Sequence, residues 1–269
     1  MSAAPLVSVV LPTIGASGSV GGVPRVFAIE AVASLLRTTD VPVEIVAVTG
    51  PAMPAEVGRP LVAVAAGAGV PCTLVPIAGP FNFSASVNLG AAHAGGRHLL
   101  LLNDDTEAIA GGWLEAMLAA LEPGDGPAVG AVGAKLLFED GTLQHAGHTY
   151  RTSLDHVGFG LPGDSVGRTG LLARRRQVVG VTAACMLTPR EVYAAVGGFC
   201  TALPGNYNDV DYCMKLSAAG WSIVYEPAAV LYHYESRSRQ SGVSADEIVA
   251  IQSRWGTRLA ADPFTPLLV

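Results

Sequence analysis

His98-Leu99-Leu100-Leu101-Leu102-Asn103-Asp104-Asp105-Thr106 is the stretch of this sequence that decides its fold. The run from His98 to Leu102 is short, apolar and bounded by polar residues, which is typical of a buried strand in a parallel sheet. Two adjacent carboxylates, Asp104 and Asp105, follow at the carboxyl end of that strand. Because ligands of open α/β sheets collect at the carboxyl ends of strands, this stretch predicts a site for a metal and a phosphate.

Strand-like and helix-like patterns alternate through the first half of the chain. Short apolar runs and apolar residues at helical spacing predict strands at 7–11, 43–48, 72–75 and 98–102 and helices at 28–37 and 84–94. Ser84 is the candidate N-cap of the second helix, whereas the alanine-rich stretch 55–66 stays ambiguous. The alternation predicts an α/β fold with a mostly parallel, doubly wound sheet flanked by helices and right-handed crossovers.

The second half of the chain departs from this alternation. Its patterns predict strands at 128–137, 178–187, 222–225 and 229–233 and helices at 112–121, 189–196, 208–219 and 247–259. The stretch 143–176 is rich in glycine, histidine and arginine and has little periodicity, so we expect a long loop region that carries binding specificity. Since no internal repeat and no long linker divides the chain, we predict a single domain over residues 1–269.

The composition narrows the class of partner. The formal net charge is −6 and only 14% of the residues are charged. This argues against nucleic acid, because a phosphate backbone is bound by a basic face. The four cysteines have no C-x-x-C spacing and lie among small or apolar residues, as free thiols in a reducing compartment do.

Two features bear on the cellular location. The first residues carry no positive charge, and the apolar run 6–11 is too short for a signal sequence. No run approaches the roughly 18 apolar residues that a membrane-spanning helix needs. We therefore expect a cytoplasmic protein without a transmembrane segment, and contact with the inner face of the membrane stays compatible with the sequence.

Three groups of polar side chains can carry chemistry. Asp104 and Asp105 offer hard oxygen ligands to Mn²⁺ or Mg²⁺, although an ordinary turn after a strand would also explain them. Asp209 and Asp211 lie in the first turn of a predicted helix, where the helix dipole favours carboxylates whether or not they react. Because these two point in different directions, at most one faces a cleft while the other caps the helix or holds a neighbouring segment. His233 ends a strand and is followed by arginines.

Read together in sequence order, these motifs resemble glycosyltransferase family 2, the inverting enzymes with the GT-A fold, and bacterial rhamnosyltransferase-like members in particular. The resemblance covers nearly the whole chain. It rests on the segments Val7-Ser8-Val9-Val10-Leu11-Pro12-Thr13, 81–90, 101–107 in the place of the DxD motif, 130–136, Gln144-His145-Ala146-Gly147, 197–199, 208–213 and Leu231-Tyr232-His233-Tyr234-Glu235-Ser236.

The resemblance implies roles for individual residues. Asp105 would ligate the divalent metal together with His233, and Asp104 would contact the ribose of the nucleotide-sugar donor. Asp209 matches the general base and Asp211 its structural companion. Further residues implied at or near the donor and metal are Pro12, Thr13, Asn82, Asn88, His145, Arg25 and Arg237. The nucleotide-sugar-binding half would span 1–106, the acceptor-binding and catalytic half 107–240, and a helical extension 241–269.

The chain also departs from the family pattern. The family usually has an acidic residue after the second strand to recognise the donor base, and here Thr49 stands there. UDP-, dTDP- and GDP-sugars therefore stay open as donors, and saccharides, lipid-linked molecules and small molecules stay open as acceptors. The glycine-rich segment 15–25 is longer than usual. Its amides and Arg25 could hold phosphates, or it could be a flexible insertion.

Two other functions remain open at this stage. The glycine-rich segment is compatible with a sugar-nucleotide nucleotidyltransferase, although Lys135 and Lys215 are poorly placed for the lysine that such an enzyme needs. The loss of an acid at Thr49 is compatible with a catalytically inactive carbohydrate-binding homologue. The sequence favours an inverting, metal-dependent transferase that acts in the synthesis of surface polysaccharides or glycoconjugates, since Asp105, Asp209 and His233 are all present.

Overall fold

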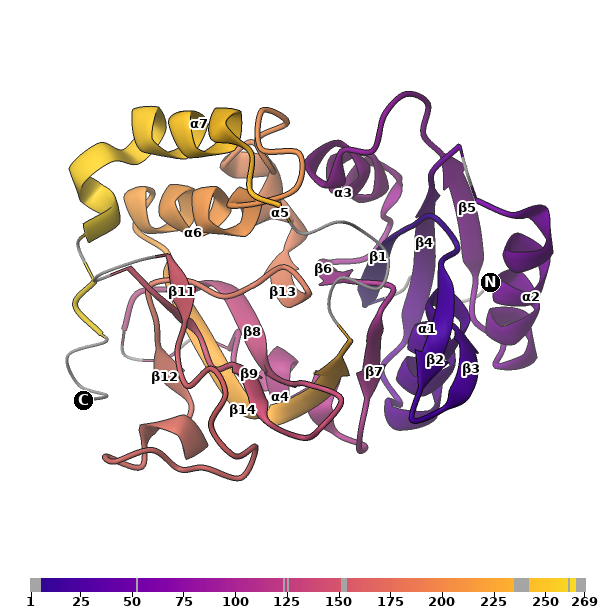
Figure 1. Ribbon diagram of the computed structural model, residues 1–269, viewed down its shortest axis with the longest axis horizontal. Coiled ribbons are helices and arrows are strands. Elements are labelled where there is room, and N and C mark those ends of the chain that lie inside the picture. Colours follow the sequence, from indigo (N-terminus) through magenta and orange to yellow (C-terminus); the bar gives the residue numbers. More distant parts are fainter. Residues whose placement is uncertain are drawn as a thin grey trace.

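A single large sheet forms the centre of the protein (Figure 1). The computed structural model describes residues 6–51, 53–122, 124, 126–150, 154–234, 242–260 and 262–264. Within them, the sheet contains β1 (Val7–Thr13), β4 (Val43–Thr49), β5 (Cys72–Pro76), β6 (His98–Leu102), β7 (Thr106–Ala108), β8 (Val129–Leu137), β9 (Leu143–His145), β12 (Arg176–Gln177), β13 (Cys185–Pro189) and β14 (Ser222–His233). Its order is β12-β14-β8-β13-β6-β1-β4-β5, with β7 beside β14 and β9 beside β8.

The first half of the sheet is parallel, as the alternation of strands and helices predicts. β1 pairs in parallel with both β4 and β6, and β4 pairs in parallel with β5. β13 then runs antiparallel to β6 and to β8, whereas β8 and β14 are parallel again. The predicted α/β class with a largely parallel sheet is confirmed.

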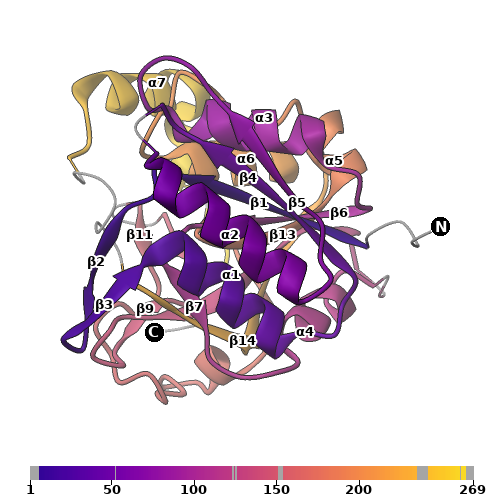
Figure 2. The ribbon, with the colours of Figure 1, turned by 90° about the vertical axis from the view of Figure 1, so that its right-hand side faces the viewer.

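Helices cover both faces of the sheet (Figure 2). The helices are α1 (Phe27–Thr38), α2 (Ala55–Gly67), α3 (Phe83–His93), α4 (Trp113–Ala119), α5 (Arg190–Ala195), α6 (Asn208–Ala218) and α7 (Ala245–Trp255), with short 3₁₀ turns at Leu171–Ala173 and Gly256–Ala260. Val9 of β1 packs in the core beneath α1, α2 and α4, and its neighbour Val10 packs in the core beneath α3, α5 and α6. Strands buried on both faces explain why the apolar runs are continuous.

Several predicted elements have different limits in the structure. The N-cap of α3 is Asn82, whose side chain accepts a hydrogen bond from the Ala85 N–H, so the prediction of Ser84 is wrong. Ser84 instead donates to the Leu203 carbonyl. The ambiguous stretch 55–66 is helix α2, and the two strands predicted at 222–225 and 229–233 are one strand, β14, with a register shift between Glu226 and Val230.

The predicted strand 178–187 is also only partly a strand, because β13 begins at Cys185. The backbone before it makes hydrogen bonds to two different segments. The Val178 N–H donates to the Ile223 carbonyl, and the Gly180 carbonyl accepts from the His148 N–H. The expected loop region 143–176 contains β9, β12 and a small antiparallel pair, β10 (His148–Thr149) with β11 (Asp155–His156).

The glycine-rich segment 15–25 folds mostly as an antiparallel hairpin of β2 (Ser17–Val20) and β3 (Val23–Val26). Gly21 and Gly22 form its two-residue turn, with φ angles of 55° and 78°. Positive φ at both central residues is the conformation of a tight hairpin turn, and it explains the glycine pair without a bound phosphate.

In the part of the chain that the structure describes, none of the helices is long and apolar enough to cross a bilayer. The cysteines Cys72, Cys185, Cys200 and Cys213 are free thiols, as expected, and Cys185 and Cys213 are buried.

Candidate active site

The segment that opened the sequence analysis forms a turn between β6 and β7. This turn follows the carboxyl end of β6 and lies next to the end of β14. Because β14 pairs antiparallel with β7, His233 lies opposite Thr106. The Tyr234 N–H donates to the Asp105 carbonyl at 2.9 Å. Strands that are far apart in sequence thus hold Asp105 and His233 together.

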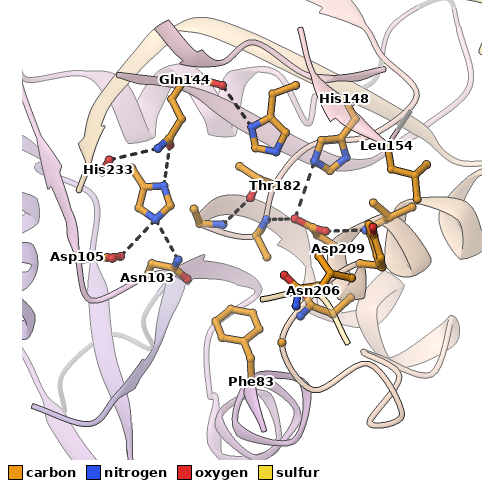
Figure 3. A pocket seen from close by; sticks show the side chains of 18 residues that line it. Phe83, Asn103, Asp105, Gln144, His148, Leu154, Thr182, Asn206, Asp209 and His233 are labelled. Carbon is orange, nitrogen blue, oxygen red and sulfur yellow. Dashed lines mark hydrogen bonds and ion pairs between the residues drawn. The ribbon is translucent and has the colours of Figure 1, made fainter. Parts of the chain in front are cut away.

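His233 is held in one orientation by Gln144 from β9 (Figure 3). The amide oxygen Oε1 of Gln144 lies 2.7 Å from His233 Nδ1, and the Gln144 amide nitrogen donates to the His233 carbonyl at 3.4 Å. Because Oε1 can only accept, Nδ1 carries the hydrogen and the lone pair is on Nε2. Second-sphere hydrogen bonds of this kind orient histidines that ligate metals.

His233 Nε2 lies close to the side chains of Asp105 and Asn103. It lies 3.3 Å from Asp105 Oδ1 and 3.2 Å from the amide nitrogen of Asn103. A nitrogen lone pair and a carboxylate oxygen at this distance repel each other, and either a cation between them or a proton on Nε2 relieves the repulsion. The Asn103 Oδ1 atom is buried and has no hydrogen-bond partner among the described residues.

This donor set fits a divalent cation. Asp105 offers a carboxylate oxygen and His233 an imidazole nitrogen, and Asn103, whose amide nitrogen faces His233, would offer its amide oxygen if the amide turned over. This mixture suits Mn²⁺ and leaves positions for diphosphate oxygens and water.

Asp104 points away from this group and into a second cavity. Its Oδ2 accepts a hydrogen bond from Thr13 Oγ1 at 2.6 Å. Burial, together with the neighbouring charge of Asp105, raises the pKa of Asp104 to about 7, and the hydrogen bond from Thr13 acts in the opposite direction. A cavity of about 160 Å³ lies here, lined by Pro12, Thr13, Ile14, Phe81, Phe83, Asn103 and Asp104.

A further cavity of about 260 Å³ adjoins this one through Thr13, Ile14 and Phe81. Its wall includes Gly50 and Pro51 after β4, and the described residues that line it include no carboxylate. The wall of this cavity next to the end of β4 is therefore mostly apolar.

Asp209 comes from the opposite side of the site, in the first turn of α6. The helix begins after Tyr207, the only non-glycine residue with positive φ (58°) among the described residues. Asp209 Oδ1 accepts from the Val210 N–H at 2.8 Å, and Oδ2 accepts from the Ala183 N–H at 3.3 Å. The Nε2 atom of His148 lies 3.9 Å from the same Oδ2.

Asp211 lies two residues along α6 and faces away from the site. Its side chain is fully buried, with Oδ1 accepting from Arg254 Nε at 2.6 Å and from Trp255 Nε1 at 2.8 Å. The Lys215 ammonium lies 3.0 Å from Oδ2. The two acids of this turn thus point in different directions, and Asp211 ties α6 to the C-terminal helix α7.

One cavity of about 280 Å³ joins the two sides of the site. Asp105, Asn103, Gln144 and His233 line it on one side and Asp209 lies across from them (Figure 3). It is lined in addition by Phe83, His148, Leu154, His156, Thr182, Ala183, Ala184, Gly205, Asn206, Tyr207, Asn208, Val210 and Val243. A reacting group in this cavity can therefore meet a cation site and a carboxylate at once.

The structure does not bring every candidate residue to these cavities. Asn82 caps α3 and donates to the Thr201 carbonyl, and Asn88 exchanges hydrogen bonds with the backbone of Phe199. Arg25 lies on the β2–β3 hairpin and pairs with Glu30 at 3.2 Å and with Glu107 at 3.5 Å.

His145 is fully buried behind the cavity wall, where its Nε2 accepts from the Thr182 N–H at 3.3 Å. Its ring packs edge-to-face against His148 and His156. The arginine predicted at Arg237 lies outside the described residues. The roles implied for these residues stay predictions.

Sequence reasoning missed three residues of the site. Asn103 and Gln144 lie inside the motifs that carry the family resemblance, but an amide side chain in such a motif has no chemistry of its own that would mark it as part of a site. The amide of Gln144 matters because its side chain reaches His233, 89 residues away in the sequence. His148 was not singled out, although it lies in the histidine-rich stretch 143–176 that was expected to carry binding specificity.

A family model described as "Glycosyltransferase like family 2" matches residues 28–256 of this chain. Among curated proteins, the chain is 39% identical over 194 residues to "Uncharacterized protein y4gI" of Sinorhizobium fredii (strain NBRC 101917 / NGR234) and 36% identical over 165 residues to "O-antigen biosynthesis protein RfbC" of Myxococcus xanthus. These matches cover 68% and 60% of this chain but only 21% and 13% of the two relatives.

Two solved structures share the fold. A structure of GalNAc-T7 with UDP, GalNAc and Mn²⁺ superposes with a TM-score of 0.71 at 13% identity, covering 96% of this chain and 49% of that one. The mannosyltransferase PcManGT from Pyrobaculum calidifontis, in complex with GDP-Man and Mn²⁺, superposes with a TM-score of 0.58 at 17% identity, covering 93% and 61%. The expected GT-A type of sheet is therefore confirmed.

Proposed function

Because this chain belongs to glycosyltransferase-like family 2, we propose that it moves a sugar from a nucleotide-diphosphate sugar to an acceptor hydroxyl with inversion at the anomeric carbon. The observation that carries the proposal is the shared cavity, with Asp105 and His233 on one side and Asp209 on the other (Figure 3). Inverting transfer needs a base on one face of the anomeric carbon and a stabilised leaving group on the opposite face.

The donor half of the site is proposed to be the turn after β6 with the two cavities beside it. The nucleotide would lie along Pro12, Thr13 and Asp104. Asp105 and His233 would hold Mn²⁺ or Mg²⁺, which when bound acts as a Lewis acid and neutralises charge on the leaving diphosphate. Gln144 keeps the His233 lone pair directed into that site.

Asp209 is proposed as the general base. Its carboxylate lines the cavity, and two backbone N–H groups fix its orientation. As the acceptor oxygen attacks the anomeric carbon, its proton passes to Asp209. A base in such a position contributes about 10² to 10⁴ in rate. Asp211, fully buried against α7, is proposed to hold the helix that carries Asp209 and not to react.

The biological setting is also a proposal. The likeness to a protein named for O-antigen biosynthesis supports hexosyl or deoxyhexosyl transfer in the synthesis of a surface polysaccharide or glycoconjugate. The donor would be a UDP-, dTDP- or GDP-linked sugar, and the two similar structures, which contain UDP and GDP-Man, support the first and the last of these. The acceptor would be a saccharide, a lipid-linked molecule or a small molecule, met in the cytoplasm or at the inner face of the membrane.

A binding screen followed by product analysis tests this function. Thermal stability is measured with UDP-glucose, UDP-N-acetylglucosamine, dTDP-rhamnose and GDP-mannose, each with and without Mn²⁺. We expect one donor to raise the melting temperature only when Mn²⁺ is present, and that donor to be converted with release of a nucleoside diphosphate. Pyrophosphate release from a nucleoside triphosphate would instead identify a nucleotidyltransferase. Absence of any stabilisation and any release would identify an inactive homologue.

A further inference from the structure

His148 lies beside the proposed base, in the wall of the same cavity. It lies on β10, directly opposite His156 of β11, and its side chain is 3% exposed. Its Nε2 atom faces Asp209 Oδ2 at 3.9 Å (Figure 3). Its Nδ1 atom lies 3.2 Å from the hydroxyl of Tyr150, which is also buried. A continuous line Tyr150–His148–Asp209 thus ends at the cavity.

The hydrogen atoms of this line can be assigned. Burial raises the pKa of Tyr150 well above its ordinary value, so the phenol keeps its hydrogen. Burial also lowers the pKa of His148 to about 4 against the opposing charge of Asp209, so the imidazole is neutral. Among the described residues the Tyr150 hydroxyl has His148 Nδ1 as its hydrogen-bond partner. The hydroxyl therefore donates to Nδ1, and the imidazole hydrogen is on Nε2, directed at Asp209.

The chain makes room for this pair at Gly180. A Cβ atom on Gly180 would lie 2.4 Å from the Tyr150 hydroxyl and 2.8 Å from His148 Nδ1, so no larger residue fits without displacing them. The φ angle of Gly180 is one that other residues can adopt. The physical reason for glycine at this position is therefore the space that His148 and Tyr150 need. The Gly180 carbonyl also accepts from the His148 N–H at 2.7 Å.

We propose that His148, oriented by Tyr150, is a positioning residue that donates a hydrogen bond from Nε2 to Asp209 and keeps this carboxylate aimed into the cavity. The inference rests on the proposed role of Asp209 as base. A hydrogen bond to the ionised form of a carboxylate favours that form and fixes its orientation. The Ala183 N–H and His148 approach the same oxygen, Oδ2. The 3.9 Å separation is expected to shorten when an acceptor fills the cavity, as catalytic hydrogen bonds commonly do.

Other titratable groups also face the His148–Tyr150 pair and must be considered in any pH experiment. They are His145, His156, Asp155, Asp209, Cys213 and Asp262. Substitutions at position 148 leave all of these groups in place, so a matched pair of variants isolates the hydrogen bond.

The matched variants are His148→Phe, which removes the donor, and His148→Gln, whose amide nitrogen can occupy the position of Nε2. The assay follows nucleoside diphosphate release from the stabilising donor with Mn²⁺, with water as acceptor, across a range of pH. We expect His148→Phe to lower kcat about 10- to 100-fold, with the donor KM unchanged. The acidic limb of its kcat profile should move about one unit to higher pH, and His148→Gln should restore that limb. A folded His148→Phe protein with wild-type kcat and limb would overturn the inference.

A second measurement is independent of turnover. Long-range ¹⁵N–¹H correlation of the imidazole rings identifies the protonated nitrogen, and loss of one signal in His148→Gln assigns His148 among the six histidines. We expect the hydrogen on Nε2 in the wild type and a mixture of tautomers in Gly180→Ala. A hydrogen on Nδ1 in the wild type would overturn the inference, even if His148→Phe did not fold. The proposed function fails separately, if Asp209→Asn keeps its turnover.

Discussion

The same substitution, aspartate to asparagine, should affect a different property of the protein at each of the two acids in the first turn of α6. Asp211→Asn removes the negative charge from a fully buried side chain with Arg254, Trp255 and Lys215 around it. Asp209→Asn removes the same charge from a side chain that lines the cavity and is 17% exposed. We expect the first change to reduce stability and the second to reduce turnover.

The size of the stability loss follows from the contacts of Asp211. Breaking a buried ion pair by removing one partner costs about 3–5 kcal/mol. Asparagine keeps an oxygen for Trp255, and the Arg254 side chain is 39% exposed, so water can solvate the cation that loses its partner. We therefore expect a loss at or just below the lower limit of this range, about 2–3 kcal/mol. At about 2–4 °C per kcal/mol, the melting temperature should fall by about 4–12 °C.

Denaturant titration and thermal melting of both variants measure this difference, and Asp246→Asn, which changes an exposed acid of α7, is the control for altered net charge. The control and Asp209→Asn should both melt close to the wild type. If Asp211→Asn melted within a degree or two of the wild type, the ion cluster would not hold α6 to α7. An equal loss in Asp209→Asn would show that the two acids are not functionally distinct.

Two other predictions follow from the same contacts. Gln144→Leu removes the acceptor of the His233 Nδ1 hydrogen and should weaken Mn²⁺ binding about 10- to 100-fold in calorimetry; unchanged affinity would mean that Gln144 does not orient His233. Burial alone would raise the pKa of Glu247, but hydrogen bonds from Asn206, Ser244 and Gly205 outweigh it and hold the pKa at about 2, against 4.5 for an ordinary glutamate. Since this folded-state value is depressed, Glu247 stabilises the protein above about pH 4.5, by about 1–3 kcal/mol, and this contribution is lost as the pH falls toward 2. Glu247→Gln should therefore be less stable than the wild type at pH 7 and equal to it at pH 2 in denaturant titrations; a difference that does not depend on pH would contradict the assignment.

The parallel half of the sheet could be predicted because its information is local. The strands β1, β4 and β6 are apolar runs, and α1, which lies between the first two, has apolar residues at helical spacing. The N-cap of α3, by contrast, depends on a contact between residues that are far apart in the sequence. Asn82 and Ser84 are both good caps, and Ser84 is instead engaged by the carbonyl of Leu203, 119 residues away. Sequence alone gives no access to that contact.

The same distinction applies to the site. Asp105, Asp209 and His233 could be proposed because residue type, position at the end of a strand or helix, and order along the chain all bear on chemistry. Gln144 and His148 act only through partners that the fold brings to them: His233 for the first, Asp209 and Tyr150 for the second. The glycine-rich segment 15–25 shows the opposite case: its composition was compatible with a phosphate loop or a flexible insertion, and its Gly21-Gly22 pair forms the tight turn of a hairpin.

The central claim is that Asp209 is the base of a sugar transfer whose donor is held at Asp105 and His233. The most direct test is the rate of nucleoside diphosphate release by Asp209→Asn, measured beside its binding of the donor and Mn²⁺. We predict that release falls by about 10² to 10⁴, while donor and Mn²⁺ raise the melting temperature as much as in the wild type. Release at close to the wild-type rate would contradict the claim and remove Asp209 from the mechanism.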